Sequence, residues 1–209
     1  MIVKNLKHFI WDFDGTLLDT YPNITGYLKM ALNDFGYDAD KTEIRRKMMI
    51  TIPYTIDYYS NLYSLPELRD RYREYYKNEK DDPVRVFDGV REVLKRIREN
   101  GGTSYIFTNR GNNIYALLER VGMADEFAEI ITADSPHFKI KPAPDAILYI
   151  MEKYGADPEN TVMIGDRECD LGSGYNAGCK TIHLFTPEAP EYPRCDWRIN
   201  NFYEMLDML

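Results

Sequence analysis

The stretch Asp12-Phe13-Asp14-Gly15-Thr16 constrains this chain more than any other feature of its sequence. An apolar run that begins at Leu6 leads into this stretch. The run is rich in aromatic and β-branched residues, and Gly15 marks where it stops. Such a run is typical of a central β-strand that ends in a turn. Two carboxylates at the end of a buried strand cost free energy unless they pair or bind a cation. The sequence therefore predicts that Asp12 and Asp14 have a chemical rather than a structural role.

Length and charge narrow the class of protein. The chain has 209 residues, of which 44% are hydrophobic, and a formal net charge of −8. This suits one larger domain with a smaller insert, and the negative charge argues against nucleic acid or an anionic membrane as a partner. No apolar run approaches the ~18 residues of a membrane span and the first residues lead directly into a strand, so we expect a cytoplasmic protein. The three cysteines lack the spacing of a zinc site, and we expect them to be reduced thiols.

We expect a separate helical domain between Tyr21 and about Lys80, because apolar, aromatic and charged residues recur there at helical spacing. The expected helices run from Pro22 to Phe35 and from Asp40 to Met49, and Pro53 and Pro66 punctuate two more. We expect Asp19 to cap the first of these helices. The segment Asp81-Asp82-Pro83 predicts the return crossing between the domains. We therefore divide the chain into a core of residues 1–16 and 84–209 and a helical insert of residues 17–83.

Strands and helices alternate after the insert. The expected strands are Thr103–Thr108, Glu129–Ala133, Thr161–Gly165 and Lys180–Phe185. The expected helices are Gly89–Asn100, which Asp88 would cap, and Asn112–Val121, Pro142–Tyr154, Leu171–Ala177 and Asn201–Leu209. Strands joined by helices require right-handed crossovers and a parallel sheet covered on both faces. The predicted fold class is α/β, a doubly wound parallel sheet interrupted after its first strand by the helical insert.

Polar residues end the predicted strands, and in an open parallel sheet ligands bind at these carboxyl ends. They are Asp12 and Asp14, then Thr108, Asn109 and Arg110, then Asp166 with Asp170, while Lys141 precedes a helix. Several carboxylates without a His or Cys partner suit a hard cation, and Mg²⁺ also keeps substrate phosphate in its shell. We expect Thr108, Lys141 and backbone amides in the Gly15 turn to hold phosphoryl oxygens. The sequence therefore predicts a magnesium-dependent site for phosphoryl transfer.

Four motifs, in this order across nearly the whole chain, resemble those of the haloacid dehalogenase superfamily, in the phosphatase branch with an inserted helical cap. They are Asp12-Phe13-Asp14-Gly15-Thr16 at a strand end, Thr108-Asn109 at the end of the next core strand, Lys141-Pro142-Ala143-Pro144 before a helix, and Gly165-Asp166-Arg167-Glu168-Cys169-Asp170. Any one of these motifs is a modest signal. The ordered set is a specific one.

The resemblance implies a role for each matching residue. Asp12 would attack phosphorus to form an aspartyl-phosphate, and Asp14 would act as acid and then base. Asp12 and Asp166 would bind the magnesium ion directly, together with the backbone carbonyl of Asp14, and Asp170 would either bind the ion or order its water shell. Thr108 and Lys141 would hold the phosphoryl group, and Gly15, Asn109 and Arg110 are further expected phosphate or substrate contacts. For Arg110, a solvated position fits the sequence equally well.

Three functions remain open on these motifs. The first is a phosphatase for a small phosphorylated metabolite, and the second is a phosphosugar mutase of the β-phosphoglucomutase type. Glu43-Ile44-Arg45-Arg46-Lys47 lacks the Ser-Arg-Glu type segment expected of a mutase cap, which favours hydrolysis. The third is a module that binds a phosphate ligand without turnover, which the intact motifs disfavour. The sequence names no particular phosphate ester and is compatible with a monomer or a homodimer.

Overall fold

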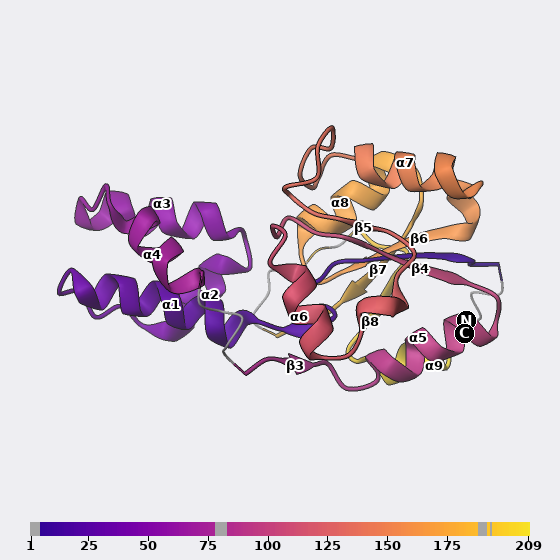
Figure 1. Ribbon diagram of the computed structural model, residues 1–209, viewed down its shortest axis with the longest axis horizontal. Coiled ribbons are helices and arrows are strands. Elements are labelled where there is room, and N and C mark those ends of the chain that lie inside the picture. Colours follow the sequence, from indigo (N-terminus) through magenta and orange to yellow (C-terminus); the bar gives the residue numbers. More distant parts are fainter. Residues whose placement is uncertain (1–4, 78–82, 188–191, 193) are drawn as a thin grey trace. The chain divides into compact units, whose positions relative to one another are not determined.

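The computed structural model describes residues 5–77, 83–187, 192 and 194–209. The chain divides into two compact units, coloured by sequence in Figure 1. The α/β unit comprises Met1–Asp19, Arg85–Thr186 and Glu191–Leu209, and the helical unit comprises Thr20–Val84 and Pro187–Pro190. Asp81 and Asp82, where we expected the return crossing, lie outside the described residues. No helix in the described ranges is long and apolar enough to cross a membrane.

The α/β unit is built on a six-stranded sheet with the order β5-β4-β1-β6-β7-β8. Its strands are β1 (His8–Trp11), β4 (Thr103–Phe107), β5 (Ile130–Ile131), β6 (Thr161–Gly165), β7 (Lys180–Leu184) and β8 (Trp197–Ile199). All neighbouring pairs are parallel, and Trp11 at the end of β1 lies opposite Ile106 of β4 and Ile164 of β6. The predicted parallel sheet is confirmed. Because β1 is central, the residues that follow β1, β4 and β6 emerge at one edge of the sheet.

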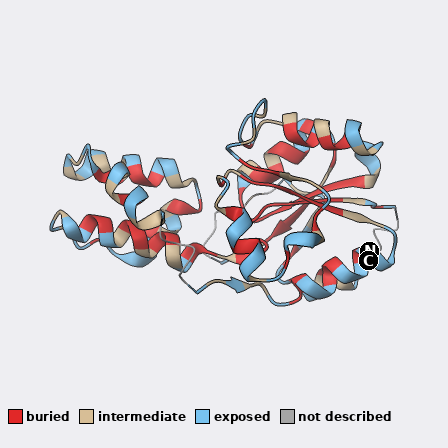
Figure 2. Ribbon diagram, in the orientation of Figure 1, coloured by how far each residue is buried: buried red, intermediate tan, exposed pale blue. Residues whose placement is uncertain are grey.

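Helices cover both faces of this sheet, with α7 and α8 on one face and α5 and α9 on the other (Figure 1). The helices of the unit are α5 (Val90–Glu99), α6 (Ile114–Arg120), α7 (Asp145–Tyr154), α8 (Glu168–Ala177) and α9 (Phe202–Leu206), with single 3₁₀ turns at Ala124–Glu126 and Pro158–Asn160. The four strands in the middle of the sheet, β4, β1, β6 and β7, are buried except for a half-buried first residue in β4, β1 and β7, and the inward faces of the helices are buried as well (Figure 2).

Alternation along β1 sends successive side chains to the two faces of the sheet. Ile10 is fully buried in a cluster that includes Ile147 and Ile150 of α7. Trp11 packs against Phe202 of α9, with 5.7 Å between the ring centroids. Burial of each such side chain contributes about 1.5–3 kcal/mol. The apolar contacts on both faces therefore fix the position of the strand that carries Asp12.

Three expected helix starts in the α/β unit are wrong. The α5 helix has Gly89, not Asp88, at its N-cap, with no side-chain cap, and a Cβ there would lie 3.0 Å from Phe202 Cβ at a φ of +88°. The α7 helix begins at Asp145 instead of Pro142, with Pro144 at its N-cap. The α8 helix begins at Glu168, three residues earlier than expected, so Asp170 lies in its first turn.

The helical unit contains four helices in its described part, as predicted: α1 (Tyr21–Asp34), α2 (Lys41–Met48), α3 (Ile52–Tyr63) and α4 (Leu68–Tyr76). They enclose a separate apolar core that includes Leu28 of α1, Ile44 of α2 and Ile56 of α3. The predicted cap of α2 is confirmed, because Asp40 Oδ1 accepts a hydrogen bond of 2.8 Å from the backbone N of Glu43.

Two short strands that we did not predict lie at the ends of the α/β segments. Strand β2 (Leu18–Asp19) pairs antiparallel with β3 (Arg85–Val86), and Asp19 lies opposite Arg85. The two places where the chain leaves and re-enters the α/β unit are therefore side by side. The expected helix cap at Asp19 is wrong, because Asp19 belongs to β2 and Thr20 is the N-cap residue of α1.

Candidate active site

The turn after β1 carries Asp12 and Asp14, which are separated in the sequence by the fully buried Phe13. The backbone N of Asp12 donates to Ile164 O at 2.8 Å, which continues the sheet for one residue beyond β1. The chain then turns sharply, because the backbone N atoms of Leu17 and Leu18 both donate to Phe13 O, at 3.0 and 3.1 Å. Gly15 has a φ of +79°, a conformation that glycine adopts at little cost. Both carboxylates are buried as a result.

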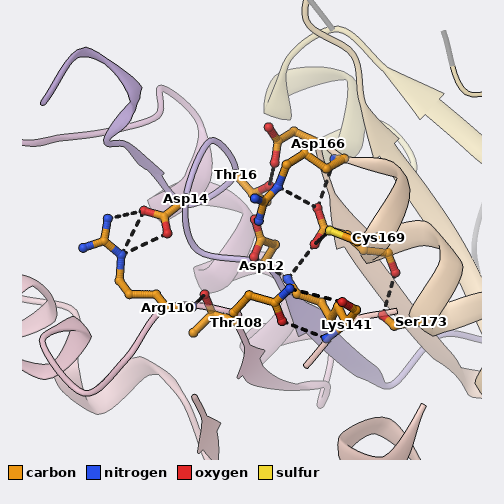
Figure 3. Close-up of polar contacts among 12 residues, drawn as sticks. Asp12, Asp14, Thr16, Thr108, Arg110, Lys141, Asp166, Cys169 and Ser173 are labelled. Carbon is orange, nitrogen blue, oxygen red and sulfur yellow. Dashed lines mark hydrogen bonds and ion pairs between the residues drawn. The ribbon is translucent and has the colours of Figure 1, made fainter. Parts of the chain in front are cut away.

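Three carboxylates meet where β1 and β6 end. Oxygens of Asp12, Asp166 and Asp170 all lie within 4.8 Å of one another, and all three residues have no exposed surface. Thr16 contributes a hydrogen bond of 3.3 Å from its Oγ1 to Asp166 Oδ1 (Figure 3). A Cβ on Gly165 would lie 2.3 Å from Asp170 Cβ, so only glycine allows the first turn of α8 to fold back against β6. The predicted convergence of these three aspartates is therefore present in the structure.

Lys141 lies among these carboxylates with no exposed side-chain surface. Its Nζ donates to Asp12 Oδ1 and is 2.6 Å from Asp170 Oδ1 (Figure 3). Arg167 is also close, with Nη2 3.6 Å from Asp12 Oδ2 and Nε 3.8 Å from Asp170 Oδ2. Asp12 Oδ2 is buried and has no hydrogen-bond partner among the described residues. A buried carboxylate oxygen in this state is one that an incoming cation or substrate can use.

Burial and charge perturb these groups in different directions. Burial, and next the nearby Asp170 carboxylate, raise the pKa of Asp12 to about 6. Burial alone would raise the pKa of Asp170 as well, but Lys141 and Arg167 outweigh it and hold that pKa below its usual value. Burial would lower the pKa of Lys141, but the Asp12 and Asp170 carboxylates raise it above its usual value. Lys141 therefore stays charged, and burial outweighs the two nearby cations at Asp12.

Asn109 fixes the backbone of Lys141. Its Oδ1 accepts a hydrogen bond of 2.7 Å from Lys141 N, and its Nδ2 donates to Lys141 O at 3.2 Å. This reciprocal pair ties the loop after β4 to the cis Lys141-Pro142 peptide. We expected Asn109 to contact phosphate, and the structure instead places its side-chain amide on the residue that carries the site's ammonium group.

Asp14 lies apart from the three-carboxylate cluster and pairs with Arg110 (Figure 3). Arg110 Nε is 3.0 and 2.9 Å from the two Asp14 oxygens, and its Nη2 is 2.5 Å from Oδ1. The side chains of Arg110 and Asp14 are only 1% and 8% exposed, which excludes the solvated position for Arg110. Thr108 holds the backbone of Arg110, because its Oγ1 accepts a hydrogen bond of 3.1 Å from Arg110 N.

Sequence reasoning missed two polar side chains at this site. Thr16 lies within the first motif and Arg167 within the fourth, and the sequence alone predicts no contact for either side chain. Both are buried and contact the aspartates named above. Their positions inside the two motifs could have identified them, because side chains in a tight loop next to buried carboxylates lie close to those carboxylates.

Comparison with known proteins identifies the family. A model of the haloacid dehalogenase-like hydrolases matches residues 9–184. The phosphoglycolate phosphatase of Vibrio vulnificus strain CMCP6 is 25% identical over 198 residues, which cover 88% of this chain and 86% of the relative. The pyrophosphatase PpaX of Oceanobacillus iheyensis is 27% identical, with 85% of this chain and 82% of the relative covered.

Solved structures agree with this family. A predicted phosphoglycolate phosphatase from Haemophilus somnus 129pt superposes with a TM-score of 0.85 over 98% of both chains, and at 22% identity it shows the fold alone. A hydrolase from Streptococcus pneumoniae TIGR4 is 30% identical, with a TM-score of 0.68 over 97% of this chain and 99% of that chain. The chain therefore belongs to the haloacid dehalogenase-like hydrolase family, and it is an enzyme of the phosphatase type.

Proposed function

We propose that this protein is a magnesium-dependent phosphatase that hydrolyses a small phosphorylated metabolite through an aspartyl-phosphate on Asp12. The observation that carries the proposal is the state of Asp12. Its Oδ1 is held by Lys141, and its Oδ2 is buried without a hydrogen-bond partner among the described residues. A carboxylate that is held in one orientation and makes few hydrogen bonds is suited to attack phosphorus.

The residues present fit a magnesium ion. Asp12, Asp166 and Asp170 supply oxygen ligands only, as a hard cation prefers, and we assign the backbone carbonyl of Asp14 as a further ligand. Burial and the Asp170 carboxylate raise the pKa of Asp12, and its Oδ2 has no hydrogen-bond partner among the described residues, so a further cation would stabilise the ionised form. When bound, the ion would neutralise the carboxylates and the incoming phosphate dianion.

The side chains of this site divide the work of the proposed reaction. Asp12 attacks phosphorus and the ester P–O bond breaks, while Lys141 and the Thr108 hydroxyl hold phosphoryl oxygens. Asp14 gives a proton to the leaving oxygen, and then takes one from the water that hydrolyses the aspartyl-phosphate. The ion pair with Arg110 holds Asp14 as a carboxylate, the form needed in the second step. This pair must loosen when the ester binds, since the first step needs a proton on Asp14.

We assign the helical unit, whose main segment is Thr20–Val84, as the cap that the sequence predicts over residues 17–83. A cap of this kind excludes bulk water from the reaction and contacts the leaving group. The β2–β3 pair supports the assignment, because it holds the two connections to the helical unit side by side. Arg45, Arg46 and Lys47 in the last turn of α2 are candidate contacts for an anionic leaving group.

The substrate class rests on the names of the relatives. They act on phosphoglycolate and on pyrophosphate by name, and each of these compounds carries a second anion beside the scissile bond. We propose a small anionic phosphate compound of this class as the substrate, in the cytoplasm. The mutase alternative is less well supported, because α2 lacks the Ser-Arg-Glu type segment.

A phosphate-release assay tests the proposal. The panel comprises phosphoglycolate, pyrophosphate, sugar phosphates and nucleotides, each with Mg²⁺ and with a chelator. We expect release from at least one compound, loss of release on chelation, and loss in Asp12→Asn but not in Asp125→Asn, an exposed aspartate of the same unit. Isomerised hexose phosphate without free phosphate would establish the mutase, and no release from any compound would establish the non-catalytic module.

A further inference from the structure

Arg167 is a second buried cation at the carboxylate cluster, beside Lys141. It occupies the N-cap position of α8, and its side chain is 7% exposed. Asp170 holds the backbone of this residue, because its Oδ2 accepts a hydrogen bond of 3.0 Å from Arg167 N. The backbone position of Arg167 is therefore set by the local fold of the loop that carries Asp166 and Asp170.

The two cations face different oxygens of the same carboxylates. Lys141 Nζ contacts Oδ1 of Asp12 and Oδ1 of Asp170. Arg167 lies near the opposite oxygens, with 3.6 Å from Nη2 to Asp12 Oδ2 and 3.8 Å from Nε to Asp170 Oδ2. These separations exceed hydrogen-bond length, so the guanidinium acts on these oxygens mainly as a charge. The arginine thus faces the Asp12 oxygen that has no hydrogen-bond partner among the described residues.

The charges of the cluster do not balance without a further cation. Three aspartates contribute three negative charges, and Lys141 and Arg167 contribute two positive charges, which leaves one net negative charge. Without Arg167 the net charge would be minus two. A guanidinium cannot lose its proton, so this contribution is permanent.

We propose that Arg167 is the internal counter-cation of this cluster, which holds the carboxylates together without metal and weakens the binding of Mg²⁺. The inference rests on the metal site of the proposed function. A divalent ion held by these carboxylates would share them with the positive charge of Arg167, which lies 3.6 Å from Asp12 and 3.8 Å from Asp170, and like charges a few ångströms apart repel even at the effective dielectric of a protein interior. The arginine therefore lowers metal affinity, and its removal raises it.

Calorimetric titration of Mg²⁺ into metal-stripped protein tests the inference without measuring turnover. The variants are Arg167→Gln, Arg167→Lys and the control Arg96→Gln, which removes an exposed arginine from α5 of the same unit. Titration at about pH 8 keeps carboxylates ionised in every variant. We expect Arg167→Gln to bind Mg²⁺ about tenfold more tightly than wild type, which corresponds to about 1.4 kcal/mol. Arg167→Lys and Arg96→Gln should stay within about threefold of wild type.

Thermal unfolding of the same proteins provides the second readout. In chelator, Arg167→Gln should melt below the Arg96→Gln control, and excess Mg²⁺ should raise its melting temperature more than that of wild type. If Arg167→Gln unfolds in chelator and folds only with Mg²⁺, the inference is supported. Equal or weaker Mg²⁺ binding by Arg167→Gln, with wild type binding normally, overturns this inference and leaves the proposed function intact. No Mg²⁺ binding by any of the proteins overturns both.

Discussion

Replacing Arg110 with glutamine leaves the Asp14 carboxylate buried without its cation. The native pair is bidentate, with Nε 3.0 and 2.9 Å from the Asp14 oxygens, and the arginine side chain is 1% exposed. Solvent therefore cannot replace the lost cation unless the loop opens. Loss of one partner from a buried pair costs about 3–5 kcal/mol. For a chain of this length, about 1 kcal/mol lowers the melting temperature by about 2–4 °C, so the expected fall is about 6–20 °C.

Urea denaturation of the single and double variants measures this effect. We expect Arg110→Gln to lower the free energy of unfolding by about 3–5 kcal/mol. The combination with Asp14→Asn should recover at least about 1 kcal/mol of that loss, because no unpaired carboxylate remains. Arg69→Gln is the matched control, since its 2.5 Å pair with Asp57 is 37% and 60% exposed and should contribute less than about 1 kcal/mol. A loss at Arg110 as small as at Arg69, or additive single effects, would refute this account of the pair.

Three further predictions follow from other contacts of the site. In chelator, the free energy of unfolding should fall by up to about 3 kcal/mol as pH rises from about 4 to about 7, because the raised pKa of Asp12, about 6, means that the folded state binds the extra proton in this window. Burial lowers the pKa of His8 and of His183, so these two groups act in the opposite direction in the same window, and Asp170 does so only at lower pH. The contribution of Asp12 is therefore the difference in slope between wild type and Asp12→Asn, and equal slopes in the two proteins would contradict the assignment. Asn109→Ala removes both hydrogen bonds to the Lys141 backbone and should reduce stability by about 1–3 kcal/mol. In steady-state kinetics it should change kcat more than KM, and an unchanged kcat would show that Lys141 does not need this support. Gly165→Ala places a Cβ 2.3 Å from Asp170 Cβ and should destabilise the protein by more than about 2 kcal/mol in urea, whereas Gly26→Ala, where no atom lies within 4 Å, should not destabilise it.

Patterns of hydrophobicity were sufficient to predict the central elements. The strands that form the middle of the sheet are short and largely apolar, and several are bounded by Gly or Asp. The helices between them imply that the strands run parallel. Strand β8 was missed because its three residues, Trp197–Ile199, are too few to show a pattern. The two-residue strands β2 and β3 pair with each other although the paired residues Asp19 and Arg85 are 66 positions apart in the sequence. No local pattern reveals such a pairing.

The carboxylates of the site were predictable, but their partners were not. Asp12, Asp166 and Asp170 follow strands whose order fixes where they meet. The partner of Asp14 depends on how the loop after β4 turns, and that loop places Asn109 on the Lys141 backbone and Arg110 on Asp14. Loop geometry of this kind is set by side-chain hydrogen bonds between segments distant in sequence. A sequence pattern gives the residue types and not these pairings.

The measurement that tests the central claim most directly is a search for the phosphoryl group on Asp12. An aryl phosphate has a leaving group that needs no proton, so Asp14→Asn should form the aspartyl-phosphate and then hydrolyse it slowly. We would quench this variant in acid during turnover with Mg²⁺ and analyse its peptides by mass spectrometry. The account predicts one added phosphoryl group on the peptide that contains Asp12, absent in chelator and in the Asp12→Asn variant. Turnover of the ester with no phosphoryl group on Asp12, or with the group on another residue, would contradict it.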